Sequence, residues 1–125
     1  MTRDEAVALI HGAYRPGTKS GHQRIICLLE LLDNPHRKLK FVHIAGTNGK
    51  GSTAAMLDHI LRAAGYRTGR FVSPYLERFE ERVTVDGQQI GERDLVDCLL
   101  QVQEAAGQLT QKGHTPPTEF ETVFA

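Results

Sequence analysis

The sequence lacks several features that would point to particular classes of protein. Its two cysteines, Cys27 and Cys98, are far apart and form no C-x-x-C pair or other metal-binding spacing. We therefore expect both to be free, buried thiols in a reducing compartment. No apolar run approaches the roughly 18 residues of a membrane span. The first residues include early acids and no long apolar segment, so we expect no signal peptide and favour the cytoplasm.

The sequence also has no excess of charge of one sign. Its 15 Lys and Arg residues equal its 15 Asp and Glu residues in number. The total charge therefore gives no indication of a nucleic-acid or membrane partner. With 125 residues, of which 40% are hydrophobic and 24% charged, the chain has the composition of one globular domain at most.

The most informative stretch runs from Phe41 to Ser52 and reads F-V-H-I-A-G-T-N-G-K-G-S. Residues 41–45 are apolar except for His43 and predict a buried strand, and apolar residues at helical spacing after Ser52 predict a helix that ends near Gly65. Backbone N–H groups at such a helix start can bind phosphate. The candidate loop consists of Gly46, Thr47, Asn48, Gly49, Lys50, Gly51 and Ser52.

Two side chains of this loop suit a nucleotide. Lys50 would supply a positive charge for the outer phosphates, and the Ser52 hydroxyl would contact a magnesium ion. The spacing is shorter than in the common P-loop, because only Thr47 and Asn48 separate the first glycine from the Gly-Lys pair. A glycine-rich turn without a ligand is the alternative interpretation.

A second strand is predicted over residues 66–72. A strand, a helix and another strand form a βαβ unit, so we expect the two strands to be parallel. Ligands in such sheets bind beyond the carboxyl ends of the strands, where Ser73 lies together with the loop. The Ser73 hydroxyl is therefore a candidate magnesium ligand, and a turn serine before Pro74 is the alternative.

The remaining elements are predicted from caps, periodicity and turn signals. The run Glu80-Glu81-Arg82 is expected to be solvated surface. Thr118 and Glu121 have the spacing of a capping box, and a helix should start there. A helix is expected to start at a capping box formed by Thr2 and Glu5. Two more helices are expected over about 22–32 and about 92–112. A hairpin is expected over 82–90, with its turn at Asp86-Gly87.

The loop G-T-N-G-K-G-S resembles the nucleotide loop of the folylpolyglutamate synthase and dihydrofolate synthase family, within the Mur ligase superfamily. The stretch N-P-H-R-K-L-K-F leads into the loop as it does in that family, and S-P-Y-L, E-R-V, D-G and T-E-F-E then follow in the family's order, so the resemblance extends over nearly the whole chain. It implies an α/β fold: a P-loop-containing, Mur-ligase-type ATP-binding domain with a parallel sheet flanked by helices, incomplete at the C-terminus. Residues 1–125 would be the N-terminal part of that domain, and the family's C-terminal domain would be absent.

The resemblance also implies a function for the parent protein. It would be an ATP-dependent carboxylate–amine ligase that adds L-glutamate to folate or dihydropteroate through an acyl phosphate, with ATP and Mg²⁺ as cofactors. We expect the parent to be a monomer, and the chain alone to be inactive because further metal ligands of the family follow later. The alternatives are a non-catalytic, truncated nucleotide-binding product and another P-loop phosphotransferase.

Site residues follow from the matching motifs. Lys50 is the expected catalytic residue, within an ATP-binding loop of residues 46–52, and Ser73 and Ser52 are the expected metal ligands. Two further segments match stretches that contact the pterin part of the substrate in relatives, although a helix cap and a helix-entry loop are their ordinary structural interpretations. These candidate substrate residues are Thr118, Glu119, Phe120 and Glu121, together with Thr18, Lys19 and Ser20.

Overall fold

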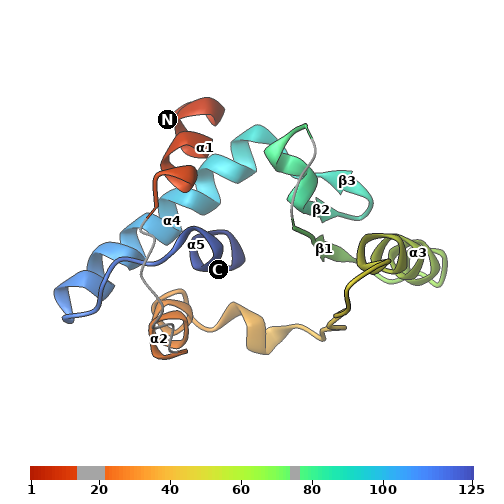
Figure 1. The fold of residues 1–125 in the computed structure, drawn as a ribbon, viewed down its shortest axis with the longest axis horizontal. Helices are drawn as coiled ribbons and strands as arrows, with labels where there is room; N and C mark the ends of the chain where they lie inside the picture. Colours follow the sequence, from red (N-terminus) through yellow and green to blue (C-terminus); the bar gives the residue numbers. More distant parts are fainter. Residues whose placement is uncertain (14–21, 74–76) are drawn as a thin grey trace. The chain divides into compact units, whose positions relative to one another are not determined.

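A computed structural model of the chain describes residues 1–13, 22–73 and 77–125 (Figure 1). These residues form two compact units, residues 1–40 with 93–125 (unit 1) and residues 41–92 (unit 2). The helices are α1 (Arg3–His11), α2 (Gln23–Leu31), α3 (Lys50–Ala63), α4 (Glu92–Gln111) and α5 (Glu119–Phe124), with short 3-10 helices η1 (Pro35–Lys38) and η2 (Phe79–Arg82); the strands are β1 (Gly69–Phe71), β2 (Val83–Val85) and β3 (Gln88–Gln89).

Two helices of unit 1, α1 and α5, begin at the caps that the sequence predicts. The Thr2 hydroxyl accepts a hydrogen bond from the Glu5 amide at 3.2 Å, and the Glu5 carboxylate accepts one from the Thr2 amide at 2.9 Å. The predicted capping box of α1 is therefore confirmed. At α5, the Thr118 hydroxyl accepts a hydrogen bond from the Glu121 amide at 3.1 Å, which confirms Thr118 as its N-cap.

The core of unit 1 lies between α2 and α4. Leu28 on α2 packs with Val102, Ala105 and Leu109 on α4, at the spacing that one face of a helix requires. The apolar pattern of α4 is wider than the face that is buried. Leu100 is part of this apolar pattern and is nevertheless 45% exposed, because it is turned about 100° around the helix from its buried neighbour Leu99.

Unit 2 contains a three-stranded antiparallel sheet in the order β1-β2-β3. Phe71 pairs with Val83 across β1 and β2, and Thr84 pairs with Gln89 across β2 and β3. The turn between β2 and β3 has positive φ angles at Asp86 (50°) and Gly87 (80°). Positive φ at both central residues is the geometry of a type I′ hairpin turn, so the predicted Asp-Gly hairpin is confirmed.

The expected parallel βαβ unit is not found among the described residues, and that prediction was wrong. Residues 41–45 form no strand, and Phe41 and Val42 are 65% and 66% exposed. Strand β1 does follow α3, but its partner is β2 and the pairing is antiparallel. The physical reason is that a strand exists only against a neighbour, and residues 41–45 have no neighbouring strand in the described part of the chain.

Both cysteines are free thiols, as expected. Cys27 is half-buried and packs against the core of unit 1, whereas Cys98 is exposed on α4, so the expectation of burial was wrong for Cys98. No helix in the described ranges has the length and apolar character needed to cross a membrane.

Candidate nucleotide site

The glycine-rich loop leads directly into α3, as the sequence predicts. Gly49 is the N-cap of α3 and has a φ of 76°, a left-handed conformation that suits glycine. The first intrahelical bond runs from the Thr53 amide to the Gly49 carbonyl at 2.9 Å. The preceding amides at the start of α3 are N–H donors without an intrahelical acceptor, and the N-cap residue makes no side-chain hydrogen bond to them.

The start of α3 is open to an approaching anion. Lys50 and Ser52 are exposed, and a Cβ placed on Gly51 would meet no atom within 4 Å. Exposed N–H groups, the positive end of the helix dipole and a lysine are the donor set that a phosphate group needs. The residues of the loop therefore fit the phosphates of a nucleotide.

The fit to magnesium is only partial. Ser52 and Ser73 would each offer one hydroxyl oxygen, and the described part of the chain holds no group of three or more His, Cys, Asp or Glu side chains that could bind a metal. Protein-bound Mg²⁺ commonly keeps several waters and takes further oxygens from substrate phosphates. A magnesium ion at this loop would thus depend on phosphate and water for most of its ligands.

Ser73 is held by a residue of η2. The Arg82 guanidinium donates a hydrogen bond from Nη2 to the Ser73 hydroxyl oxygen at 3.1 Å. The Val72 amide donates to the Arg82 carbonyl at 2.9 Å, and the guanidinium lies 5.4 Å from the centre of the Phe79 ring. Glu80 and Arg82 are both buried, so the expectation of a solvated charge run at residues 80–82 was wrong for these two.

Asp58, which sequence reasoning missed, connects α3 to the sheet. Its side chain is buried, accepts a hydrogen bond from the Thr68 hydroxyl and forms an ion pair with the Nε atom of Arg62 at 3.3 Å. The hydrogen bond from Thr68 lowers the pKa of Asp58 against the effect of burial, with further lowering by the charges of Arg62 and Arg70. The Asp58–Arg62 pair has i,i+4 spacing, which is the one signal in the sequence that could have indicated it.

The hairpin turn completes this connection. The Thr68 amide donates to the Asp86 carboxylate at 2.8 Å, and the Asp86 amide donates to the Thr68 carbonyl at 2.8 Å. Arg62 lies against the turn so closely that a Cβ on Gly87 would be 2.5 Å from its Nη1 atom. The helix that starts at the candidate nucleotide loop is therefore anchored to the β2–β3 turn.

The T-E-F-E segment lies in unit 1 and engages other side chains of that unit. The Glu121 carboxylate accepts a hydrogen bond from Arg24 Nε at 2.8 Å, and both side chains are nearly buried, with 11% of Arg24 and 13% of Glu121 exposed. The bonds from Arg24 lower the pKa of Glu121, although burial acts in the opposite direction. Glu119 pairs with His11 Nδ1 at 3.1 Å, and Phe120 is exposed and stacks on Phe124.

The predicted site residues are thus divided between the two units. The loop of residues 46–52 and Ser73 belong to unit 2, and residues 118–121 belong to unit 1. Thr18, Lys19 and Ser20 lie outside the described residues.

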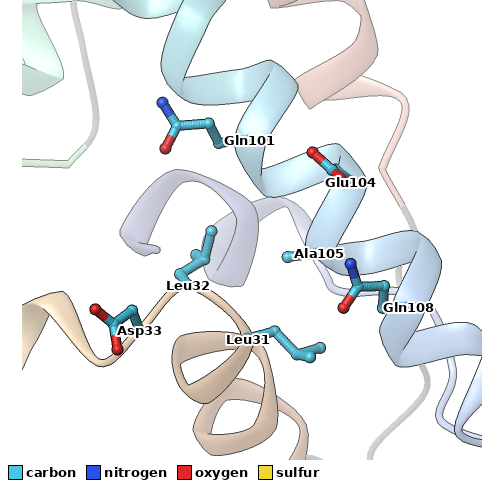
Figure 2. Close-up of a pocket in the computed structure, with 7 residues that line it drawn as sticks. All are labelled: Leu31, Leu32, Asp33, Gln101, Glu104, Ala105 and Gln108. Atoms are coloured by element: carbon cyan, nitrogen blue, oxygen red, sulfur yellow. The ribbon is translucent and has the colours of Figure 1, made fainter.

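Unit 1 also has an open groove with a volume of about 290 Å³ (Figure 2). None of its lining residues belongs to a predicted site. Figure 2 shows that the lining comes from the end of α2 and from Leu32 and Asp33 after it on one side, and from α4 on the other. The lining residues are Leu31, Leu32, Asp33, Gln101, Glu104, Ala105 and Gln108.

Comparison with known proteins gives long, strong matches. The folylpolyglutamate synthase of Lacticaseibacillus casei is 38% identical over 126 residues, which cover 100% of this chain and 29% of that protein. The dihydrofolate synthase/folylpolyglutamate synthase of Bacillus subtilis is 39% identical over 121 residues, which cover 97% of this chain and 28% of that protein. No protein-family model matches the chain.

Solved structures agree with these matches. The folylpolyglutamate synthetase from Lactobacillus casei has a TM-score of 0.91 at 38% identity, over 98% of this chain and 31% of that chain. A complex of folylpolyglutamate synthase with AMPPCP and folate has a TM-score of 0.92 at 38% identity, over 98% of this chain and 30% of that chain.

These likenesses place the chain in the Mur-ligase-type fold class, of which it has a part. Within that class, the chain is a homologue of the folylpolyglutamate synthase and dihydrofolate synthase family, as the motifs of the sequence predict. It spans about three tenths of the length of these relatives, and corresponds to their N-terminal part.

Proposed function

We propose that the chain is the N-terminal part of the ATP-binding domain of an ATP-dependent ligase that joins L-glutamate to a folate or dihydropteroate carboxylate. The exposed start of α3, which carries Lys50 and Ser52 in a chain homologous to folylpolyglutamate synthases, is the observation that carries the proposal. The C-terminal domain of the family would follow in the parent protein.

The proposed reaction forms an amide in two steps. A carboxylate oxygen of the pterin substrate attacks the γ-phosphorus of ATP, which gives an acyl phosphate and releases ADP. The glutamate amine then attacks the acyl carbon, so that phosphate leaves and the amine gives up a proton. Both steps depend mainly on positioning and on neutralising the charge of the phosphoryl group.

The residues of unit 2 have defined parts in this proposal. The amides of residues 47–51 would hold the β- and γ-phosphates, and the Lys50 ammonium would neutralise the charge that develops on the γ-phosphoryl group. Ser52 and Ser73 would hold Mg²⁺ with their hydroxyl oxygens. The ion would contribute charge neutralisation of the phosphate oxygens when it is bound.

The pterin end of the substrate is assigned to residues 118–121 and to Thr18, Lys19 and Ser20. Within the first segment, Phe120 has the exposed aromatic ring that could stack on a pterin. Glu119 and Glu121 already pair with His11 and Arg24, so their part would be to hold the segment in shape. We further propose a monomeric parent in the cytoplasm, where free thiols such as Cys27 and Cys98 persist.

Lys50→Ala tests the proposal. In the parent enzyme, loss of this charge should lower kcat/KM by about 10²-fold or more, because one electrostatic contact to the transition state is worth about 3 kcal/mol. The measurement is glutamate-dependent ADP release in the presence of ATP and dihydropteroate or folate. Lys40→Ala is a matched control, since Lys40 is also exposed and lies outside the loop. Unchanged kinetics for Lys50→Ala would contradict the assignment.

The product separates the ligase from a P-loop phosphotransferase, which the same loop could serve. A ligase yields an amide together with ADP and phosphate, and needs glutamate. A phosphotransferase yields a stable phosphorylated substrate without glutamate.

A further inference from the structure

We propose that Arg82 is a positioning residue that orients the Ser73 hydroxyl toward the magnesium-bound nucleotide. The inference rests on the proposed function of Ser73 and adds a residue that the sequence motifs do not assign to the site. Its basis is the hydrogen bond from Arg82 Nη2 to Ser73 Oγ at 3.1 Å.

The guanidinium is held firmly enough to act in this way. Arg82 is only 9% exposed, and its side chain lies over the ring of Phe79, which is itself buried. Its carbonyl accepts a hydrogen bond from the Val72 amide at 2.9 Å, so its backbone binds the residue directly before Ser73. Arg82 therefore contacts the 72–73 segment through both its backbone and its side chain.

The hydrogen bond restricts what the Ser73 hydroxyl can do. A hydroxyl oxygen has two lone pairs and one proton. The N–H of Arg82 takes one lone pair, which leaves one lone pair for a cation and directs the proton away from the guanidinium. Ser73 is exposed, so a free hydroxyl would rotate among several positions, and the bond reduces this freedom.

Two other arginines of unit 2 have different partners. Arg78 is directed elsewhere, with ion pairs to Glu80 at 3.4 Å and to Glu92 at 3.7 Å. Arg67 is highly exposed and pairs with Asp86 at 3.5 Å. Removal of a residue that holds a metal ligand by a hydrogen bond typically lowers the metal affinity about 10- to 100-fold.

The test measures binding of AMPPCP to the parent protein by titration calorimetry, with Mg²⁺ and with EDTA. The readout is the ratio of the two affinities, which requires no turnover. We expect Arg82→Met and Ser73→Ala to reduce this ratio to a similar extent, by about tenfold or more. Arg67→Met is the control, and it should leave the ratio unchanged because Arg67 does not contact Ser73.

The double variant identifies the route of the effect. If Arg82 acts through Ser73, Arg82→Met should have no further effect on the ratio in a Ser73→Ala background. An equal loss of affinity with Mg²⁺ and with EDTA would overturn the inference, since it would indicate a direct contact of Arg82 with phosphate. An additive double variant would overturn it as well.

The failures of the two proposals are distinct. If Ser73→Ala removes the magnesium dependence and Arg82→Met does not, the inference about Arg82 is wrong and the assignment of Ser73 stands. If the unaltered parent protein binds AMPPCP equally with Mg²⁺ and with EDTA, or not at all, the assignment of Ser73 fails and the inference fails with it. If thermal unfolding shows that Arg82→Met does not fold, Arg82→Lys replaces it, because lysine keeps the charge and lacks the forked guanidinium; the same reduction of the ratio is expected.

Discussion

Removal of the Asp58 carboxylate should loosen the connection between α3 and the β2–β3 turn. Asp58→Ala deletes the acceptor for the Thr68 hydroxyl and the ion-pair partner of Arg62. A hydrogen bond to a charged group is worth about 1.5–3 kcal/mol, and breaking a buried ion pair by removing one partner costs about 3–5 kcal/mol. The Arg62 side chain is 29% exposed, so water stabilises the cation that remains. We therefore expect the free energy of unfolding to fall by about 2–3 kcal/mol.

Urea unfolding, followed by far-UV circular dichroism, measures this change. The midpoint should fall while the slope with urea stays constant, because the surface exposed on unfolding is the same. Asp97→Ala is the control: Asp97 is exposed on α4, and its replacement should change the free energy by less than about 0.5 kcal/mol. A loss for Asp58→Ala no larger than that of the control would refute the reasoning.

The pH dependence provides a second, independent check of the same interaction. The folded state lowers the pKa of Asp58, so its charge stabilises the fold above the pKa of about 4 that an unfolded Asp has. This contribution is lost as the pH falls through the lowered pKa. The stability difference between the unaltered chain and Asp58→Asn should thus be largest near neutral pH and shrink below about pH 4. A difference that is constant from pH 7 to pH 3 would show that the charge of Asp58 is not involved.

Two further substitutions probe the turn and a helix cap. Gly87→Ala should lower the free energy of unfolding by more than about 1 kcal/mol, since alanine is strained at positive φ and its methyl group would displace Arg62. Gly65→Ala is the control, because Gly65 has a φ of 93° and open space around it, and it should cost less in the same urea titration. An equal cost for the two variants would exclude the contact with Arg62. Thr118→Ala should lower the free energy of unfolding by about 1 kcal/mol because the Glu121 amide loses its acceptor, whereas Thr118→Ser should retain most of the stability. Equal stabilities of the two variants would argue against the cap.

Local signals in the sequence predicted much of the fold correctly. The Thr2 capping box, the Asp86-Gly87 turn and the Thr118 cap each involve residues within a few positions of one another, and the structure confirms all three. Such features depend on backbone conformations and hydrogen bonds that neighbouring residues provide by themselves.

Predictions that depend on distant residues succeeded less well. The strand over residues 41–45 needs a neighbouring strand, which the described part of the chain does not provide, and the apolar pattern alone cannot show this. Arg24 and Glu121 are 97 positions apart, so no spacing rule connects them. Asp58 lies among apolar residues of α3, where a charged side chain is normally exposed, and only the later Thr68 and the turn at residues 86–87 explain its burial.

The composition of the two units has a consequence for how the chain folds as it is synthesised. All contacts within unit 2 join residues between 41 and 92, so this unit can form while α5 is still being made. Unit 1 joins the two ends of the chain: His11 meets Glu119 across 108 positions, and Leu28 packs against Leu109. Closing so long a loop delays these contacts, and α1 and α2 must wait for α4 and α5 to leave the ribosome. The middle of the chain is thus able to fold before its beginning, although its beginning is made first.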